Sequence, residues 1–289
     1  MTAPEVPQLL RWYESSAREL PWRGPGAGAW AVLVSEVMLQ QTPVARVLPA
    51  YRAWLARWPS PPALAAAPVA EAVRQWGRLG YPRRALRLHD AAQVILARHG
   101  GEVPGSVSVL RTLPGVGAYT AAAVACFAFG QRLPVLDTNV RRVLARLVGG
   151  QERPPGGLTT AEAALAGSLL PADPATAARW SVAVMELGAL VCTAARPRCA
   201  DCPVAGACAW RLAGKPSVAT RPAGQRYEGT DRQCRGRLLA ILREAPRPVP
   251  ASRLRAAWPD PVQQARALQS LVADGLAEPR PGGRYALPS

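Results

Sequence analysis

The sequence has little lysine, little histidine and no long apolar run. Lys215 is the only lysine among 35 basic residues, and the longest apolar stretch, 119–129, is shorter than the roughly 20 residues of a membrane-spanning helix. The first twenty residues also lack the apolar core of a secretion signal. We therefore expect a cytoplasmic protein in a reducing environment, where its six cysteines favour a metal site over disulfides.

Acidic residues are also scarce, since 19 stand against 35 basic residues and leave a net charge of +16. A chain this basic attracts polyanions, so DNA, RNA and an acidic membrane surface are the candidate partners. From Lys215 onward, 13 basic and 6 acidic residues leave +7, with +9 before it, so the excess is spread along the chain. Genomic base composition would explain the preference for arginine over lysine, but not the shortage of acids.

Apolar residues recur at helical spacing through 1–212, interrupted by proline or glycine. This pattern predicts a mainly α-helical domain without a convincing strand, followed by a polar linker at 213–230. The expected helices are 5–18, 29–41, 43–57, 68–77, 82–99, 106–112, 118–129, 138–148, 159–170 and 174–190.

The C-terminal region, 231–289, has a different pattern. Helical periodicity at 231–244, 251–257 and 261–274 precedes two short apolar segments around the turn Pro281-Gly282-Gly283. Three helices and a short hairpin predict a small winged-helix-like domain. A small helical cap packed on the main domain is the alternative.

Four of the six cysteines lie within seventeen residues, in the spacing Cys-x6-Cys-x2-Cys-x5-Cys. Ionised thiolates this close share a metal or repel one another, and four soft ligands suit either structural zinc or an iron–sulfur cluster. We expect the other two cysteines to be unligated. The predicted ligands are Cys192, Cys199, Cys202 and Cys208.

A glycine hairpin, LPGVGAYT at 113–120, joins two helical patterns. Its glycines permit positive φ, so backbone N–H groups and the next helix N-terminus could hold a phosphate. An ordinary tight helix–helix turn would have the same sequence. The candidate DNA-backbone contacts are Gly115, Val116, Gly117 and Thr120.

Two carboxylates also stand out. Asp137 in LDTNV lies at an expected helix start, where capping is the ordinary role of an aspartate. Glu36 in SEVMLQQT lies among Val, Met and Leu, where desolvation would raise its pKa as a general acid requires. A solvent-facing glutamate on an amphipathic helix is the alternative for Glu36.

Six motifs together resemble the adenine DNA glycosylase (MutY) family of the helix-hairpin-helix, or endonuclease III, superfamily. They are SEVMLQQTPV, LGYP at 79–82, LPGVGAYT, LDTNV, MELGALVC at 185–192 and the cysteine loop at 192–208. The resemblance covers about residues 7–212. It implies a two-lobed helical fold that grips double-stranded DNA containing a mismatched adenine, with a [4Fe–4S] cluster in the cysteine loop.

The resemblance also implies roles for single residues. Glu36 matches the acid that protonates adenine at N7, and Asp137 matches the carboxylate that stabilises the positive sugar, as in glycoside hydrolysis. Tyr119 and Asn139 match positions that line the active site. The other matches surround the extruded adenine, namely Trp22, Arg23 and Glu186, or form the wedge that enters the base stack, namely Gln41 and Tyr81.

Some features depart from the family. Thr138 stands where many members carry glycine, and the usual C-terminal module for 8-oxoguanine is shortened or replaced. We therefore expect adenine excision opposite both 8-oxoguanine and guanine, with a reduced preference for the oxidised base. Tyr119 occupies the position at which bifunctional relatives carry lysine, so we expect a monofunctional enzyme. We also expect a monomer, because nothing in the sequence demands more.

Two other functions fit parts of the sequence. A thymine or uracil glycosylase acting at mismatched guanine also carries a tyrosine in its hairpin, although SEVMLQQT and MELG favour adenine. An iron–sulfur DNA-binding regulator would use the cluster and the winged helix without the two carboxylates. Release of adenine or of thymine from mismatched duplexes would distinguish the two glycosylases, and DNA binding without base release would indicate the regulator.

Overall fold

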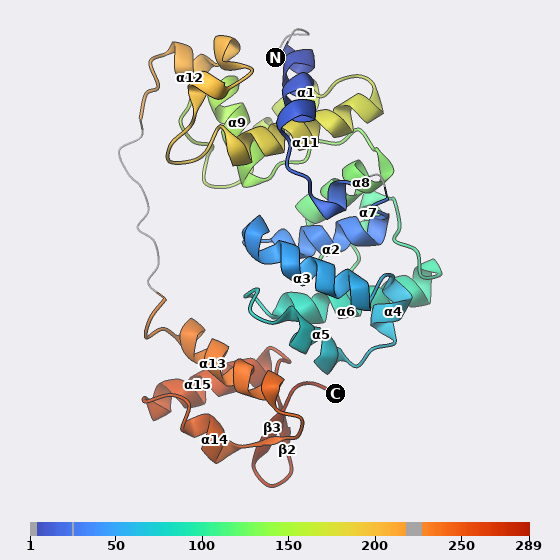
Figure 1. Cartoon of the computed structure of the whole chain (residues 1–289), viewed down its shortest axis with the longest axis vertical. Helices are drawn as coiled ribbons and strands as arrows, with labels where there is room; N and C mark the ends of the chain where they lie inside the picture. The colour runs from blue at the N-terminus through green and yellow to red at the C-terminus, as the bar shows by residue number, and fades with distance from the viewer. Residues whose placement is uncertain (1–4, 25, 218–226) are drawn as a thin grey trace. The chain divides into compact units, whose positions relative to one another are not determined.

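A computed structural model of the chain describes residues 5–24, 26–217 and 227–289 (Figure 1). By its internal contacts the chain divides into two compact units. The first comprises 1–32, 105–111 and 116–222, and the second comprises 33–104, 112–115 and 223–289. Helix α2 (Ala29–Leu39) begins in the first unit and ends in the second.

The first unit is built from helices around a core in which Leu9, Val143, Trp180 and Leu187 are buried. Its long helix α11 packs against α9 and α1. The helices are α1 (Glu5–Ser16), α7 (Val107–Leu110), α8 (Ala118–Phe129), α9 (Thr138–Leu147), α10 (Thr160–Leu169), α11 (Pro174–Leu190) and α12 (Ala209–Leu212), with short 3-10 turns η1 (Pro21–Arg23), η2 (Cys199–Asp201) and η3 (Ala205–Ala207).

The second unit combines helices with one small sheet. Its antiparallel strands lie in the order β1-β3-β2, with Tyr285 of β3 opposite both Val249 and Pro279. The helices are α3 (Val44–Arg57), α4 (Pro61–Ala65), α5 (Val69–Trp76), α6 (Arg83–His99), α13 (Asp231–Glu244), α14 (Ala251–Arg255) and α15 (Pro261–Ala273), and the strands are β1 (Val249–Pro250), β2 (Glu278–Arg280) and β3 (Arg284–Ala286).

The predicted mainly helical fold class is confirmed, and within 1–212 the described residues contain no strand. Helix α4 is not predicted by the periodicity, because Pro61 and Pro62 resemble a loop. Proline is tolerated in the first turn of a helix, and here the Ser60 side chain caps it. The helix predicted at 29–41 ends at Leu39, so Gln41 lies in a turn instead.

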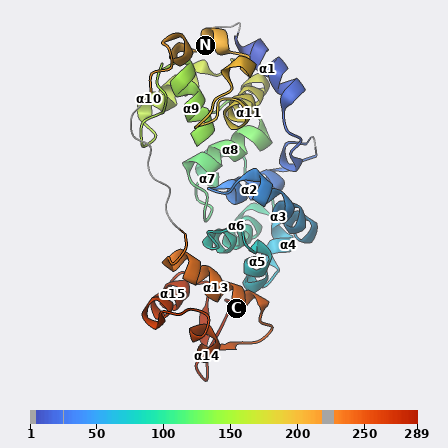
Figure 2. The same cartoon turned by 60° about the vertical axis from the view of Figure 1, so that its left-hand side comes forward.

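The C-terminal helices share a core with α5 inside the second unit. Val73 of α5 belongs to the apolar cluster formed by Leu238, Leu242 and Leu271. Arg243 Nε also donates to the Val73 carbonyl at 2.9 Å. Figures 1 and 2 both show α13 beside α5. This region therefore has the predicted helices and hairpin, and it packs on a helix of the main domain.

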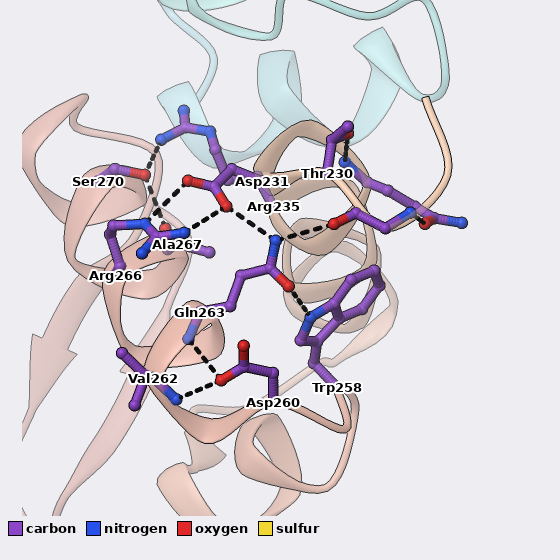
Figure 3. A network of polar contacts seen from close by, with 12 residues as sticks. Thr230, Asp231, Arg235, Trp258, Asp260, Val262, Gln263, Arg266, Ala267 and Ser270 are labelled. Carbon is purple, nitrogen blue, oxygen red and sulfur yellow. Dashed lines mark hydrogen bonds and ion pairs between the residues drawn. The ribbon is translucent and has the colours of Figure 1, made fainter. Parts of the chain in front are cut away.

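A polar network connects the start of α13 to α15 (Figure 3). Gln263 accepts a hydrogen bond from Trp258 Nε1 at 2.6 Å and donates one to Asp231 at 2.9 Å. Arg266 binds the same carboxylate through two nitrogens, at 2.9 and 2.7 Å. The hydrogen bonds from Arg266 and Gln263 lower the pKa of Asp231 to about 2.

The last two sequence-based expectations about the fold concern the domain ranges and the absence of a membrane-spanning helix. The domain ranges predicted from the sequence stay predictions, and residues 218–226 of the expected linker lie outside the described residues. No helix in the described part of the chain is long and apolar enough to cross a membrane.

Helices α9 and α11 approach closely at Gly188, where a Cβ atom would lie 2.7 Å from Asn139 Cβ and 2.9 Å from the Asn139 carbonyl oxygen. We expect Gly188→Ala to lower the free energy of unfolding by about 1–3 kcal/mol, because the helices must separate to admit a methyl group. Denaturant unfolding measures this.

Gly167 in α10 is the matched control, since a Cβ atom there has no neighbour within 4 Å. We expect Gly167→Ala to be neutral or to stabilise by up to about 1 kcal/mol, through helix propensity alone. Equal stabilities of the two variants would show that α9 and α11 are not in close contact at this point.

Candidate active site

The predicted site residues are divided between the two units. The second unit contains Glu36, Gln41, Tyr81 and Gly115. The first unit contains the others, which are Trp22, Arg23, Val116, Gly117, Tyr119, Thr120, Asp137, Asn139, Glu186, Cys192, Cys199, Cys202 and Cys208.

Asp137 is the N-cap residue of α9. Its Oδ1 accepts a hydrogen bond from the Val140 backbone N–H at 2.6 Å, and its Oδ2 accepts one from Asn139 Nδ2 at 2.7 Å. Burial raises the pKa of Asp137 above its ordinary value, although these hydrogen bonds oppose the shift. These hydrogen bonds hold the carboxylate in one orientation. A carboxylate that caps a helix can therefore also be oriented for a catalytic role.

Arg142 connects this carboxylate to the cysteine loop. Its Nη2 donates to Asn139 Oδ1 at 2.8 Å and to the Gly188 carbonyl at 2.7 Å, and its Nε donates to the Cys192 carbonyl at 2.7 Å. The polar contacts therefore run from Asp137 through Asn139 and Arg142 to the first predicted metal ligand. Sequence reasoning missed Arg142, because nothing in the pattern separates it from the other arginines of α9.

Glu186 on α11 is fully buried and binds two arginines. Arg18 Nε and Nη2 each donate to one carboxylate oxygen at 2.7 Å, and Arg23 Nη1 donates at 2.9 Å. Burial opposes ionisation of Glu186, but the hydrogen bonds from Arg18 and the charge of Arg23 lower its pKa to about 2. Trp22, beside Arg23 in η1, is also buried. Arg18 is a further residue that the sequence does not single out.

The glycine hairpin has the geometry that its sequence predicts. Gly115 has a φ of +79°, and a Cβ atom there would lie 2.8 Å from Arg87 Cβ, so both the conformation and the contact require glycine. Gly117 caps the N-terminus of α8. Val116 and Thr120 are buried, and their predicted contact with phosphate stays a prediction.

Tyr119 and Glu36 both lie on helices with apolar surroundings. Tyr119 of α8 is half-buried against the cluster formed by Ala123, Cys126 and Val135. Glu36 is 5% exposed on α2, between the buried residues Ser35 and Val37. The alternative of a solvent-facing glutamate is therefore wrong, because both faces of this helix segment are covered.

The four cysteines of the loop line one cavity. Three of them, Cys192, Cys202 and Cys208, pack against the apolar core of the first unit. Arg146 is 1% exposed and donates to Cys192 Sγ at 3.4 Å. Its guanidinium lies over the Trp210 ring at 4.7 Å. Arg146 therefore lies in the wall of the cavity that the four cysteines line.

The arrangement of these thiols bears on the kind of metal group. Among the described residues, no three His, Cys, Asp or Glu side chains converge in a way that would hold a single metal ion. Thiolates of a tetrahedral zinc site converge on one atom, whereas those of a [4Fe–4S] cluster each bind a different iron and lie farther apart. The four cysteines that line the cavity are the residues that would hold a metal group.

Gln41 and Tyr81 have an unusual backbone conformation. Their φ angles are +54° and +45°, in the left-handed region that non-glycine residues rarely adopt. Such a conformation costs about 1–3 kcal/mol and persists only where the surroundings hold it. Both side chains are exposed, and that of Tyr81 is 53% exposed. An exposed side chain on a held backbone is what a wedge requires.

A glycine hairpin before α8 and a four-cysteine loop after α11 are typical of a class of helical DNA-repair proteins. The similarity of this chain to known proteins points to the same class. The family described as HhH-GPD superfamily base excision DNA repair protein matches residues 34–165. A structure described as a thermostable thymine-DNA glycosylase is 27% identical, with a TM-score of 0.64, and covers 72% of this chain and 95% of that chain.

Two relatives are similar over nearly the whole chain. The adenine DNA glycosylase of Mycolicibacterium smegmatis is 53% identical, with 97% of this chain and 94% of the relative covered. That of Mycobacterium tuberculosis H37Rv is 54% identical, with 97% and 92% covered. The chain therefore belongs to the adenine DNA glycosylase family of the HhH-GPD superfamily.

The buried Glu186 carboxylate should make stability depend on pH. Its pKa is about 2 in the fold against an ordinary value of 4.5, so its ionised form stabilises the protein above that value and loses the effect as pH falls toward 2. We expect Glu186→Gln to lower the free energy of unfolding by about 3 kcal/mol at pH 7, by this linkage.

Denaturant unfolding of both proteins at several pH values tests this. The difference between them should shrink as pH falls from 5 toward about 2, because Glu186 then takes up a proton in the wild-type fold. A difference that stays constant over this range would show that the loss comes from packing and not from the ion pairs.

Proposed function

We propose that the chain is a DNA glycosylase that hydrolyses the N-glycosidic bond of adenine mispaired with 8-oxoguanine or guanine in duplex DNA. The observation that carries this is the likeness to two adenine DNA glycosylases, which extends over 97% of the chain and so includes the C-terminal region. The thymine-DNA glycosylase structure is much less similar, at 27% identity. The net charge of +16 suits a DNA partner.

In the proposed reaction, Glu36 donates a proton to N7 of the extruded adenine while the bond between C1′ and N9 breaks. The sugar becomes positively charged, and the ionised Asp137 stabilises that charge. Water adds to C1′, and the proton that it loses restores the acid form of Glu36. The buried position of Glu36 supports its role, since it keeps the carboxyl group away from bulk water.

The other predicted residues have supporting roles. Asn139 holds the Asp137 carboxylate through its hydrogen bond. Tyr119 would line the active site. Arg23, held by Glu186, and the neighbouring Trp22 surround the extruded base. Gln41 and Tyr81 fill the space that the base leaves, which offsets the cost of extruding it. Backbone N–H groups of the hairpin 115–120 bind phosphate.

The cysteine loop would hold a [4Fe–4S] cluster through Cys192, Cys199, Cys202 and Cys208. Such a cluster supplies four covalent links between distant points of the loop and so fixes its shape. The Arg142 contact with the Cys192 carbonyl would then transmit this order to Asn139 and Asp137.

Single-turnover assays on duplexes with A opposite 8-oxoguanine, A opposite G and T opposite G test the function. We expect release of adenine from the first two and no release of thymine. Glu36→Gln and Asp137→Asn should each lower the rate by about 10²–10⁴-fold, the usual contribution of such groups, without weakening DNA binding.

Asp173→Asn is the matched control, because Asp173 caps α11 as Asp137 caps α9 but lies exposed. It should leave the rate unchanged. Thymine release without adenine release would favour the thymine glycosylase, and DNA binding without any base release would favour a regulator. Unchanged rates in Glu36→Gln or Asp137→Asn would show that the acid or the stabiliser is another residue.

We expect protein purified without oxygen to be brown, with the absorption near ~400 nm that iron–thiolate clusters show. Cys202→Ser should lose this absorption and its iron, because one of four ligands is gone. Cys234→Ala, which changes a cysteine outside the loop, should keep both. Colourless wild-type protein that contains stoichiometric zinc would contradict the cluster.

We expect no efficient strand cleavage through a Schiff base. That chemistry needs an amine that attacks the sugar, and Tyr119 stands at the position where bifunctional relatives carry lysine. Borohydride should therefore trap no adduct of the wild-type protein with DNA. Tyr119→Lys, which restores the amine, is the control and should form the adduct. Trapping of wild type at the level of this variant would contradict the prediction.

A further inference from the structure

Arg84, near the start of α6, is a buried cation whose hydrogen-bond partners are backbone carbonyls and one hydroxyl, with no carboxylate among them. It is 8% exposed. Its Nη1 donates to the carbonyls of Val37 and Met38, both at 2.9 Å, and to that of Gln40 at 2.6 Å. These are carbonyls at the C-terminal end of α2, where a helix leaves its last acceptors unsatisfied. Arg84 therefore caps the end of α2, just before Gln41.

The same guanidinium binds the loop that carries Tyr81. Nη2 donates to the Gly80 carbonyl at 3.1 Å, and Nε donates to the Tyr81 carbonyl at 3.4 Å. The charge also lies 5.5 Å from the centre of the Tyr81 ring. Nη2 further donates to Thr42 Oγ1 at 2.9 Å, on the far side of Gln41. One side chain thus binds both neighbours of Gln41 and the loop of Tyr81.

These contacts hold two backbone segments in a conformation that non-glycine residues rarely adopt. Gln41 and Tyr81 are two of the three non-glycine residues with positive φ among those described, and a chain segment leaves this conformation unless something holds it. They are forty positions apart in the sequence, yet their segments share one guanidinium. Burial lowers the pKa of Arg84 only to about 10, so its charge persists at neutral pH.

We propose that Arg84 is a positioning residue, which holds the backbone at Gln41 and Tyr81 so that the two side chains enter the DNA stack together. The proposal rests on the proposed function, since it takes these two residues as the wedge. A guanidinium offers five donors in a rigid plane, whereas an ammonium offers three donors around one point. Lysine would keep the charge but could not bind all these acceptors at once.

The test is a mutant cycle that separates positioning from general stability. Arg84→Lys is made in the wild-type chain and in a chain that carries Gln41→Ala and Tyr81→Ala. Adenine release is measured in single turnover. Fluorescence of 2-aminopurine, placed beside the mismatch in a duplex bound by Asp137→Asn protein, reports unstacking without excision. Arg98→Met, an exposed arginine of the same helix, is the matched control.

We expect Arg84→Lys to slow adenine release and to reduce the 2-aminopurine signal by about tenfold in the wild-type chain, because a displaced group loses its alignment. In the chain that carries Gln41→Ala and Tyr81→Ala, Arg84→Lys should change the rate of adenine release and the 2-aminopurine signal by less than about twofold. The effects of coupled residues are not additive, so Arg84 has little left to position once the wedge is gone. Arg98→Met should change neither. An equal loss in both chains, or no loss in the wild-type chain, would overturn the proposal.

Thr42→Val is the second test variant, used if Arg84→Lys does not fold. It preserves side-chain shape but removes the hydroxyl that accepts from Arg84. It should slow adenine release in the wild-type chain but not in the chain that carries Gln41→Ala and Tyr81→Ala. The fluorescence also separates the two proposals. Wild-type protein that unstacks the duplex but releases no adenine would contradict the proposed function, and Arg84 would still be judged by the fluorescence cycle.

Discussion

Buried guanidinium groups are the constraint on which the functional parts of this protein depend. An arginine inside a protein stays charged, so each of its N–H groups needs an acceptor, and carbonyl groups at loop and helix ends supply them. The buried Arg84 binds carbonyls of two segments, and the buried Arg146 binds a carbonyl of the cysteine loop. The half-buried Arg142 binds the Gly188 carbonyl near the end of α11 and the Cys192 carbonyl beyond it. Segments that share one guanidinium cannot move independently without leaving a buried charge unpaired.

Burial also sets the carboxylates apart from one another. Glu186 and Asp137 both lose water, which favours the protonated form of each. Two arginines reverse this effect at Glu186, whereas an amide and a backbone N–H only weaken it at Asp137. Glu186 is thus an anion at neutral pH, and it anchors Arg18 and Arg23. Asp137 is left as a carboxylate with a raised pKa at the start of a helix.

Much of the secondary structure followed from periodicity and punctuation. Helices α8, α11 and α13 have the predicted bounds, because glycine, proline or a capping residue precedes each of them. The strand β1 and the 3-10 turns of the cysteine loop were not predicted, because two or three residues are too short for any period to appear. The end of α2 was placed two residues late, and carbonyls at this end are bound by Arg84, which comes from a distant part of the sequence.

The sequence by itself determined the types of group available for chemistry: the cysteine spacing, the glycine hairpin, the carboxylates Glu36 and Asp137, and the absence of lysine from the hairpin. These are local properties, carried by residue type and spacing. Only the tertiary structure decided that Glu36 is buried, that Glu186 binds two arginines, and that Arg84 joins the segments of Gln41 and Tyr81. The reason is physical, because desolvation and hydrogen bonding depend on neighbours that the fold brings from far along the chain.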